Sequence, residues 1–367
     1  MRSVELRGIK KSYDGEILLE NLDLKIPSGK FFALLGPSGC GKTTILRLIG
    51  GFEKADAGDI LIGDRVVTNL PSNQRSVNTV FQNYALFPHL NVFDNIAYSL
   101  RVRHVDDETI RQRVTKLVAA FGIEKHIFKN INQLSGGQQQ RVAVARAVIN
   151  EPSVLLLDEP LAALDMRTRE RMLVELIDLQ DLLKTTFVYV THDPFEALTV
   201  ADQMAIMNVD GAIEQIGTPQ EIYEFPVSSF VAEFVGATNI LSGQLMLAGD
   251  DAYLVVPNLG RFAIDVSRQR EIQAPWLVSG NTVLLSIRPE KIEIRKGAHG
   301  GAIPHLHGKV ETMVYYGHST LYHVRVSPEC VIRVFDKNEQ HVQAEVIGYD
   351  DEVCLYWHEK NAVVLER

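Results

Sequence analysis

The sequence predicts an α/β domain built around a parallel sheet, followed by a smaller all-β domain. Two observations lead to this prediction. Up to about residue 236, apolar strand-like runs alternate with helical segments, which is typical of a parallel sheet covered on both faces. Beyond that point the segments become short, β-branched or aromatic, with Gly, Pro and Asp turns between them, as in a small barrel or sandwich. The length of 367 residues suits two or three domains, and we place the boundary between 236 and 237.

The first domain, 1–236, is expected to contain strands and helices in turn. Continuous apolar runs indicate strands that are buried on both faces, and 154–157 is a clear example. Strands are expected at 4–6, 17–19, 31–35, 154–157, 186–190 and 204–211, and helices at 43–49, 107–121 and near 173–183. The stretch from about 88 to 152 reads mainly as helix, so we expect a helical subdomain there. In the second domain, 237–367, strands are expected at 310–316, 321–326 and 353–357.

Composition and charge exclude several classes of protein. Hydrophobic residues make up 46% of the chain and charged residues 23%, the balance of an ordinary globular protein rather than a disordered or fibrous one. The net charge is −9 and no basic patch is evident, so nucleic acid is not an expected partner. The three cysteines, Cys40, Cys330 and Cys354, form neither a metal-ligand spacing nor a disulfide framework, which suits a reducing cytoplasm.

The sequence also predicts that the chain does not insert into a membrane. Residues 1–7 carry charges where a signal peptide needs an apolar core. Apolar runs such as 154–157 are far shorter than the roughly 20 residues that a spanning helix requires. If the protein works at a membrane, we therefore expect it to do so through a partner.

Residues 36–43, Gly-Pro-Ser-Gly-Cys-Gly-Lys-Thr, fit the P-loop pattern and lie between an apolar strand and a helix. Glycines let successive backbone N–H groups curl around phosphates, and the helix N-terminus adds partial positive charge. Lys42 would reach the β- and γ-phosphates, and the Thr43 hydroxyl would bind Mg²⁺. A glycine-rich turn that binds nothing is the weaker alternative, because the strand and helix are both in place. The expected ATP contacts here are Gly36, Pro37, Ser38, Gly39, Cys40, Gly41, Lys42, Thr43 and Thr44.

A second nucleotide element is the run 154–159, Val-Leu-Leu-Leu-Asp-Glu, a buried strand that ends in two acids. Asp158 is suited to hold Mg²⁺ through water, and Glu159 to orient and polarise the attacking water as a general base. Alone, such a pair more often caps a helix, but a P-loop upstream weakens that alternative.

The segment 134–138, Leu-Ser-Gly-Gly-Gln, which we call the signature segment, is followed by Gln-Gln-Arg and indicates the family. Ser135 and two glycines that open an apolar helix make a second anion-binding helix terminus, whose natural use is to face a neighbour's P-loop. Here the sequence resembles the nucleotide-binding subunit of ABC transporters. The resemblance implies a P-loop NTPase fold, with a RecA-like parallel sheet core and a helical subdomain, that hydrolyses ATP with Mg²⁺.

Further residues match this family in the family's order. The resemblance implies that Tyr13 stacks on adenine, that Gln82 is the Q-loop glutamine and a ligand of Mg²⁺, and that His192 is the switch histidine. The catalytic set is then Glu159, His192 and Gln82. The resemblance also implies that ATP bound to the partner subunit is contacted by Ser135, Gly136, Gly137 and Gln138.

The D-loop of this family matches 163–165, that is Ala163-Leu164-Asp165. The family usually has Ser at the position of Ala162, so this chain lacks one hydroxyl expected near the dimer seam. The hydrolysis assignment is unaffected by that departure, and its effect on the coupling between the two ATP sites is left open.

The C-terminal part, with Ile-Arg-Pro-Glu at 287–290, resembles the all-β, OB-like (TOBE) extension of importer ATPases of the maltose, iron and polyamine type. Within that class, 77–89 and 134–144 are most similar to the spermidine/putrescine importer ATPases. The resemblance implies a homodimer with two permease subunits and an external solute-binding protein, at the cytoplasmic face of the plasma (inner) membrane. The β domain would serve regulation or dimerisation.

The segment after Gln82 also resembles the groove that receives the permease's cytoplasmic helix. The apolar and aromatic residues in question are Tyr84, Leu86, Phe87 and Phe93. The alternative, which the sequence does not exclude, is that they form core of the helical part.

Other functions and cargoes stay open at this point. Ferric ion, a sugar or glycerol phosphate are alternative cargoes, because none of these residues contacts the cargo. A non-transport ABC ATPase would usually carry two nucleotide domains or long coiled coils, and a P-loop kinase would lack the signature segment. A module that only binds ATP is disfavoured, because Lys42, Asp158, Glu159 and His192 are all present.

Overall fold

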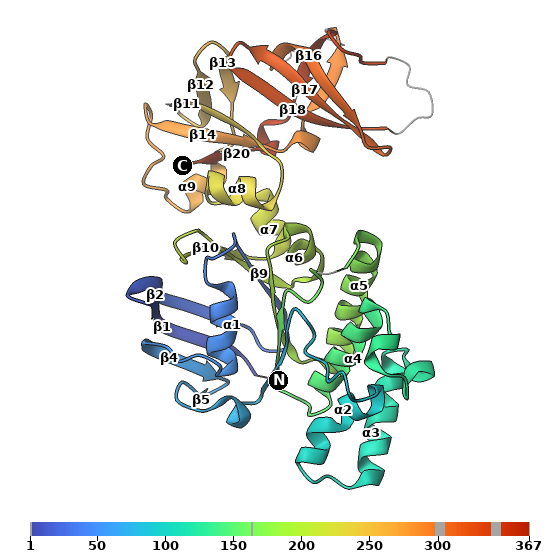
Figure 1. Ribbon diagram of the computed structural model, residues 1–367. Coiled ribbons are helices and arrows are strands. Elements are labelled where there is room, and N and C mark those ends of the chain that lie inside the picture. The colour runs from blue at the N-terminus through green and yellow to red at the C-terminus, as the bar shows by residue number, and fades with distance from the viewer. Residues whose placement is uncertain (1, 163, 298–304, 339–345, 367) are drawn as a thin grey trace. The chain divides into compact units, whose positions relative to one another are not determined.

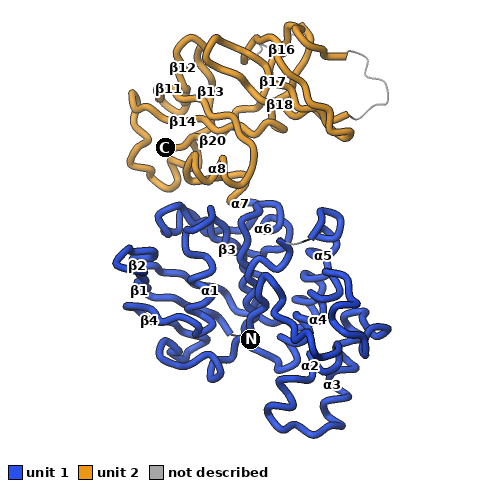
Figure 2. The backbone as a smooth tube through the Cα atoms, viewed as in Figure 1, with its two compact units in different colours: residues 1–220 blue, residues 221–367 orange. Residues whose placement is uncertain are grey.

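The computed structural model describes residues 2–162, 164–297, 305–338 and 346–366. The chain divides into two compact units, 1–220 and 221–367, coloured separately in Figure 2. The predicted order, an α/β P-loop domain followed by an all-β domain, is confirmed. The boundary placed after residue 236 stays a prediction. By packing, α7 (Pro219–Glu224) spans the division and α8 (Ser229–Val235) belongs to the second unit.

The first unit is organised around a six-stranded sheet in which all strands but the edge strand β10 run parallel. In sheet order its strands are β10 (Ile213–Gly217), β9 (Gln203–Met207), β3 (Phe31–Leu35), β8 (Thr186–Thr191), β7 (Val154–Asp158) and β6 (Val77–Val80). Successive side chains of a strand point to opposite faces. Leu156 and Val188 accordingly belong to the core beside α1 (Lys42–Gly50), whereas Leu155 and Phe187 belong to the core on the other face.

A second, antiparallel sheet shares the core on the α1 side, as Figure 1 shows. In sheet order its strands are β2 (Glu16–Ile26), β1 (Val4–Tyr13), β4 (Ala57–Ile62) and β5 (Arg65–Val66). The expected strands at 4–6 and 17–19 are therefore much longer than the sequence indicated, because β1 and β2 pair with each other along most of their length. One face of the parallel sheet is thus covered by a helix and a sheet together, the other by helices α4 and α5.

The expected helical stretch contains α2 (Val92–Val102), α3 (Asp107–Ala120) and α4 (Gly136–Val148), with the short 3-10 turns η2 (Glu124–His126) and η3 (Ile131–Gln133). Outside that stretch the first unit also contains α5 (Met166–Leu183), α6 (Pro194–Val200) and the 3-10 turn η1 (Ser72–Gln74). Helices α2, α3 and α4 bury a common apolar core that includes Ile96, Val114 and Val142. The side chains of Asn91, Asp106 and Ser135 cap the N-termini of these three helices.

The second unit consists of two five-stranded antiparallel sheets that share one apolar core. The strands of one sheet are β13 (Gly260–Ala263), β12 (Asp251–Val256), β11 (Asn239–Ala248), β14 (Thr282–Ile287) and β20 (Ala362–Leu365). Those of the other are β15 (Glu293–Lys296), β19 (Glu352–Tyr356), β16 (Leu306–Tyr315), β17 (Ser319–Ser327) and β18 (Cys330–Lys337). Besides α8, the described part of this unit contains three short helical segments: α9 (Ser267–Glu271), η4 (Pro289–Lys291) and η5 (Glu359–Asn361).

A buried arginine explains why α8 packs with the β domain. The guanidinium of Arg288 donates to the carbonyls of Ala232 (2.7 Å) and Gly236 (3.0 Å), at the C-terminal end of α8. It also lies 4.2 Å from the centre of the Tyr223 ring. Because removal of Arg288 would leave buried carbonyls unpaired, this residue ties the helix to the sheets that follow it in sequence.

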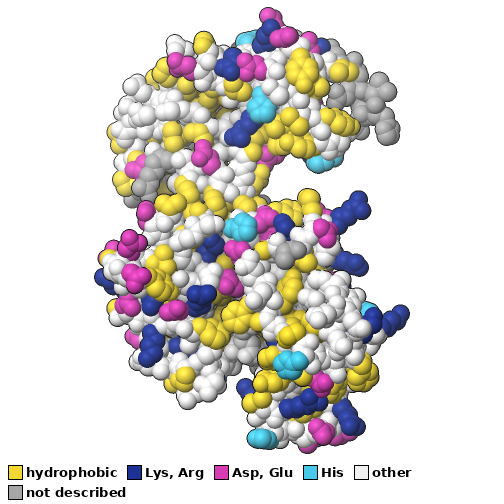
Figure 3. All heavy atoms as spheres, viewed as in Figure 1, with side chains coloured by type: hydrophobic (Ala, Val, Ile, Leu, Met, Phe, Trp, Pro, Cys, Tyr) yellow, Lys and Arg dark blue, Asp and Glu magenta, His cyan; other side chains and the backbone are white. Residues whose placement is uncertain are grey.

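Charged side chains are mixed on the face of the molecule shown in Figure 3. Lysines and arginines alternate with aspartates and glutamates over the first unit, and no large patch of one sign stands out on that face. Neighbouring charges of opposite sign therefore compensate each other locally.

Candidate functional site

Four of the expected site segments leave the parallel sheet at one edge. Leu35 at the end of β3 pairs with Thr191 at the end of β8, and Asp158 at the end of β7 pairs with Val190. Strand β6 pairs with β7 in the same direction, and Gln82 follows two residues after its last residue. The carboxyl edge of a parallel sheet is where α/β folds bind ligands. The fold thus gathers the P-loop, Gln82, Glu159 and His192 at that edge.

The P-loop connects β3 to α1 through a glycine-rich turn. Gly39 and Gly41 have φ angles of 85° and 102°, which residues with a Cβ rarely adopt. Gly41 is the N-cap of α1, yet no side chain caps this helix and no acidic residue lies in its first turn. The first N–H groups of α1 therefore remain available to an anion, and the helix dipole favours one there.

Lys42 is held inside the P-loop rather than extended into solvent. Its side chain is buried, and its Nζ donates to the carbonyls of Gly36 (2.8 Å) and Pro37 (2.7 Å). An ammonium group with three donors can exchange such carbonyls for phosphate oxygens without leaving the loop. The loop is thus folded around its lysine.

Thr43 and Asp158 come together although 115 positions separate them in sequence. The Thr43 hydroxyl donates to Oδ1 of Asp158 at 3.1 Å. Burial raises the pKa of Asp158 above its ordinary value; the hydrogen bond from Thr43 lowers it and the neighbouring Glu159 charge raises it further. A hydroxyl and a carboxylate oxygen are hard ligands of the kind that Mg²⁺ prefers.

Glu159 and His192 face each other across the ends of β7 and β8. Oε1 of Glu159 lies 3.2 Å from Nδ1 of His192. Glu159 has a left-handed backbone, with φ 44°, and its N–H donates to the carbonyl of Val190 at 3.0 Å. A strained non-glycine residue of this kind is held by its surroundings and is frequent at functional sites.

A buried polar network supports the loop that carries His192, and the sequence reading did not identify it. Glu196 on α6 accepts hydrogen bonds from the hydroxyls of Tyr189 (2.7 Å) and Thr191 (2.6 Å), both on β8. Arg169 on α5 binds Asp193 (3.2 Å) and reaches Glu196 (3.6 Å). The sequence holds one signal of it, an Asp-Pro pair that caps α6, but the partners on β8 and α5 come from the fold.

The signature segment opens α4 as expected. Ser135 is exposed and caps the helix, with its Oγ 3.4 Å from the N–H of Gln138, while the Gln138 side chain accepts from the N–H of Ser135 at 3.0 Å. The Gln138 amide also contacts His126 at 3.1 Å. Gln138 is therefore engaged within its own chain. The cap takes up the N–H of Gln138 and leaves the Ser135 O–H and the N–H groups of Gly136 and Gly137 as donors for a second molecule.

The signature glycines have a second function, in packing. A Cβ at Gly136 would lie 3.2 Å from the Leu164 side chain, and one at Gly137 would lie 3.6 Å from that of Thr168. Leu164 belongs to the D-loop. Asp165 caps α5 by accepting from the N–H of Thr168 at 3.1 Å, and it also accepts from the Thr168 hydroxyl at 2.7 Å. Both hydrogen bonds, that from the hydroxyl most, lower the Asp165 pKa. Ala163, the first residue of the expected D-loop, lies outside the described residues.

The other expected residues differ in their exposure to solvent. Tyr13 ends β1 with 40% of its surface exposed, and the ammonium of Lys11 lies 4.8 Å from the centre of its ring. Gln82 is exposed on the loop after β6. In the expected permease groove, Tyr84 is buried in the apolar core, whereas the ring of Phe87 lies 4.5 Å from that of the exposed Tyr98. The expected groove thus mixes core residues and accessible ones.

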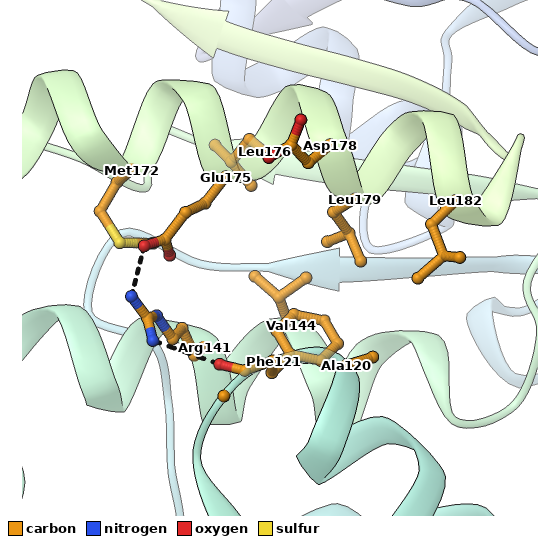
Figure 4. Close-up of a pocket in the computed structure, with 11 residues that line it drawn as sticks. Ala120, Phe121, Arg141, Val144, Met172, Glu175, Leu176, Asp178, Leu179 and Leu182 are labelled. Atoms are coloured by element: carbon orange, nitrogen blue, oxygen red, sulfur yellow. Dashed lines mark hydrogen bonds and ion pairs between the residues drawn. The ribbon is translucent and has the colours of Figure 1, made fainter.

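A separate apolar cavity of about 320 Å³ lies between the end of α3 and helices α4 and α5. Figure 4 shows Val144, Leu176 and Leu179 on its walls and the ion pair of Arg141 with Glu175 at one end. Arg141 also donates to the carbonyl of Phe121 at 3.2 Å, which ties α3 to α4. The cavity contains none of the expected ATP contacts, so it is a feature of helix packing apart from the nucleotide loops.

Comparisons with known proteins identify the family of the chain. Residues 19–162 match the family model "ABC transporter", and residues 285–365 match the model "TOBE domain". The chain is 43% identical to the spermidine/putrescine import ATP-binding protein PotA of Thermotoga maritima, over 99% of this chain and 98% of that protein. It is 48% identical to the protein of the same name from Nitratidesulfovibrio vulgaris, over 86% of this chain and 84% of that one.

Among solved structures, the chain is similar to the ATP-binding cassette MJ0796 in a dimeric, post-hydrolysis state bound to ADP and Pi. The two are 33% identical with a TM-score of 0.53, over 59% of this chain and 98% of the other. Across the part of the chain that the structure describes, no helix is both long and apolar enough to cross a membrane.

Proposed function

This chain belongs to the family of spermidine/putrescine import ATP-binding proteins, and we propose that it is the subunit that hydrolyses ATP to drive polyamine uptake. One observation carries the chemistry: Lys42, Thr43, Asp158, Glu159 and His192 meet at the carboxyl edge of a single parallel sheet. The near full-length relatives carry the choice of cargo.

Binding of ATP begins at the P-loop. The uncapped N-terminus of α1 receives the phosphates on backbone N–H groups, and Lys42 exchanges the carbonyls of Gly36 and Pro37 for phosphate oxygens. Tyr13 lies at the end of β1 with its ring accessible for stacking on adenine.

The residues present fit a magnesium ion. Thr43 and Asp158 already place a hydroxyl and a carboxylate oxygen 3.1 Å apart, and Gln82, on the loop after β6 at the same edge, would add an amide oxygen. Thr43, Asp158 and Gln82 would hold the ion, Asp158 through water. When bound, it would neutralise charge on the β- and γ-phosphates.

Hydrolysis requires a group that takes a proton from water beside the γ-phosphate. Glu159 is that group, since it is a carboxylate at the strand end with Oε1 3.2 Å from Nδ1 of His192. His192 orients Glu159, and the network of Arg169, Glu196 and Thr191 keeps the His192 loop in place. Glu159 can then take the proton of the attacking water, and the proton can pass to bulk solvent on the exposed side of His192.

A second copy of the chain completes the site. The exposed Ser135 and the N–H groups of Gly136 and Gly137 would cap the γ-phosphate held by the partner subunit, giving two ATPs per homodimer. The half-buried Leu86, Phe87 and Phe93 would receive a cytoplasmic helix of the permease, and the permease with an external binding protein would select the cargo. The chain would then act at the cytoplasmic face of the membrane through that partner.

Uptake of labelled spermidine and putrescine by the native cells tests this function. A chromosomal Lys42→Ala variant should lose most polyamine uptake, because the P-loop then lacks the cation that grips the β- and γ-phosphates. Uptake of ferric ion, of a sugar and of glycerol phosphate, measured in the same cells, serves as the control. Intact polyamine uptake with a defect in one control would retain the importer ATPase and replace the cargo.

A further inference from the structure

The loop that carries Gln82 contains an unfavourable stretch of backbone. Tyr84 and Ala85 follow each other with φ angles of 59° and 44°. In this left-handed region a Cβ crowds the following carbonyl oxygen, and non-glycine residues visit it singly rather than in pairs. Such a conformation persists only where the surrounding structure imposes it. The nearest local bonds, from Tyr84 N–H to the Phe81 carbonyl (2.8 Å) and from Ala85 N–H to the Asn83 carbonyl (2.7 Å), close the turn.

Arg146 on α4 binds both strained residues at once. Its Nη2 donates to the carbonyl of Tyr84 and its Nη1 to that of Ala85, each at 2.8 Å. A planar guanidinium can hold two adjacent carbonyls with one rigid fork, which a lysine ammonium cannot do. The guanidinium also lies 5.2 Å from the centre of the Phe87 ring, three residues further along the loop.

The loop is attached to the helical subdomain at a second point as well. Asn95 on α2 is fully buried, and its side chain accepts from the N–H of Phe87 (2.9 Å) and donates to the carbonyl of the same residue (3.1 Å). The loop after Gln82 is therefore held by α2 and α4. Only its beginning belongs to the sheet, through β6.

Arg146 lies on the helix that begins with the signature segment. Ser135 caps α4, and Arg146 follows eleven positions later, about 16 Å along the axis at 1.5 Å per residue. A single rigid helix thus connects the group that would touch the partner's ATP with the loop that carries Gln82.

We propose that Arg146 is a positioning residue that locks the Gln82 loop to the signature helix, so that the two move as one body. This inference rests on the proposed function and specifies how the signature helix and the Gln82 loop of one subunit are linked. Arg146 holds the left-handed turn at Tyr84 and Ala85 by binding both of their carbonyls. When Arg146 is lost, the turn relaxes to a more favourable backbone conformation and Gln82 is displaced.

Kinetics of the purified full-length chain tests the lock. Arg146→Met should lower kcat for ATP about tenfold or more while KM stays within about threefold, because the P-loop that binds ATP is not touched by Arg146. Ala85→Gly introduced into Arg146→Met should recover at least about threefold of that loss, since glycine adopts the left-handed region without steric cost. Arg146→Lys should fall between Arg146→Met and the wild type, because it keeps the charge and loses the fork.

Arg111→Met is the matched control. Arg111 is exposed on α3, and its substitution removes the same charge from the same subdomain. It should leave kcat unchanged. A wild-type kcat in Arg146→Met overturns the proposal, and so does a loss of kcat that Ala85→Gly leaves fully in place. If Arg146→Met does not fold, Arg146→Lys with and without Ala85→Gly gives the same comparison.

Amide hydrogen exchange over 81–90 gives a readout that needs no hydrolysis. We expect exchange in this segment to be about tenfold faster in Arg146→Met than in Arg111→Met. Unchanged exchange in a folded Arg146→Met overturns the attachment even if the chain is an ATPase. If the wild-type chain hydrolyses no ATP while Arg146→Met still exchanges faster than Arg111→Met, the proposed function is refuted and the attachment of the loop stands.

Discussion

The carboxylate of Asp158 lowers the stability of the folded protein when no cation neutralises it. Its carboxylate is partly buried at the end of β7, and this burial raises its pKa above the ordinary value. A raised pKa in the folded state means that stability is fully present below the unfolded pKa and is lost as the pH rises through the folded pKa. The ionised form at neutral pH is therefore destabilised unless a cation neutralises it, as is expected of a carboxylate that binds a metal ion.

Asp158→Asn should accordingly raise the melting temperature of the nucleotide-free chain at pH 7. Asparagine keeps an acceptor for the Thr43 hydroxyl and removes the charge that burial penalises. The difference in melting temperature between Asp158→Asn and the wild type should shrink as the pH falls below the raised pKa, because the wild-type carboxyl is then neutral too. Thermal melts from pH 7 to pH 4, with Asp210→Asn on an exposed turn as the control, measure it. A gap independent of pH would contradict this account.

At the scale of single elements, α1 depends on an arginine that is distant from it in sequence. Arg75 is buried, and its Nη1 donates to the carbonyls of Leu48 (2.6 Å) and Ile49 (2.9 Å) in the last turn of α1. Its Nε and Nη2 donate to the carbonyls of Leu70 (2.9 Å) and Thr68 (3.0 Å). Arg75 thus caps the C-terminus of the helix whose N-terminus would bind phosphate.

Arg75→Met should destabilise the first unit by about 3 kcal/mol. Methionine fills the space of the apolar part of the arginine side chain, but the buried carbonyls lose their hydrogen-bond donor. Urea unfolding followed by circular dichroism measures the change. Arg65→Met, at an exposed position on β5, should change stability by less than about 0.5 kcal/mol. Equal, small effects of the two substitutions would show that the Arg75 cap is dispensable.

Which elements could be predicted depended on where their partners lie. Helix α3 and strand β7 follow from local sequence, because a segment rich in helix formers and a continuous apolar run each specify one element. The antiparallel sheet of β1, β2 and β4 was missed, since β1 and β2 owe their length to pairing with each other and β1 also pairs with β4, which follows after α1. The networks around Arg169, Arg146 and Arg75 were missed for the same reason: an arginine in the sequence does not say which carbonyls it will meet.

At the scale of the whole molecule, the chain has separate apolar cores in its two units. The P-loop, Asp158, Glu159 and His192 all belong to the first unit. These residues were found from sequence because each is fixed by a short motif, whereas their meeting at one sheet edge required the parallel strand order. Units with separate cores are expected to unfold as separate cooperative transitions.

Calorimetry of the full-length Glu159→Gln variant tests this division. The substitution removes the general base, so ATP with Mg²⁺ should bind and persist. ATP at about 100 times its Kd should stabilise the transition of residues 1–220 by about 2.7 kcal/mol and leave that of 221–367 unmoved. Lys42→Ala in the same background should abolish the shift. A shift confined to the transition of 221–367 would place nucleotide binding in the other unit.

The close packing of Gly136 against Leu164 has a consequence for timing in a dimer. A Cβ at Gly136 would already crowd Leu164, so the signature helix is in close contact with the D-loop of its own subunit, and a movement of the helix toward the neighbour's nucleotide would be transmitted to that loop. Each subunit would then register the arrival of ATP on the other as a displacement of its own chain. Hydrolysis at the two ATP sites of the dimer would then be correlated in time rather than independent.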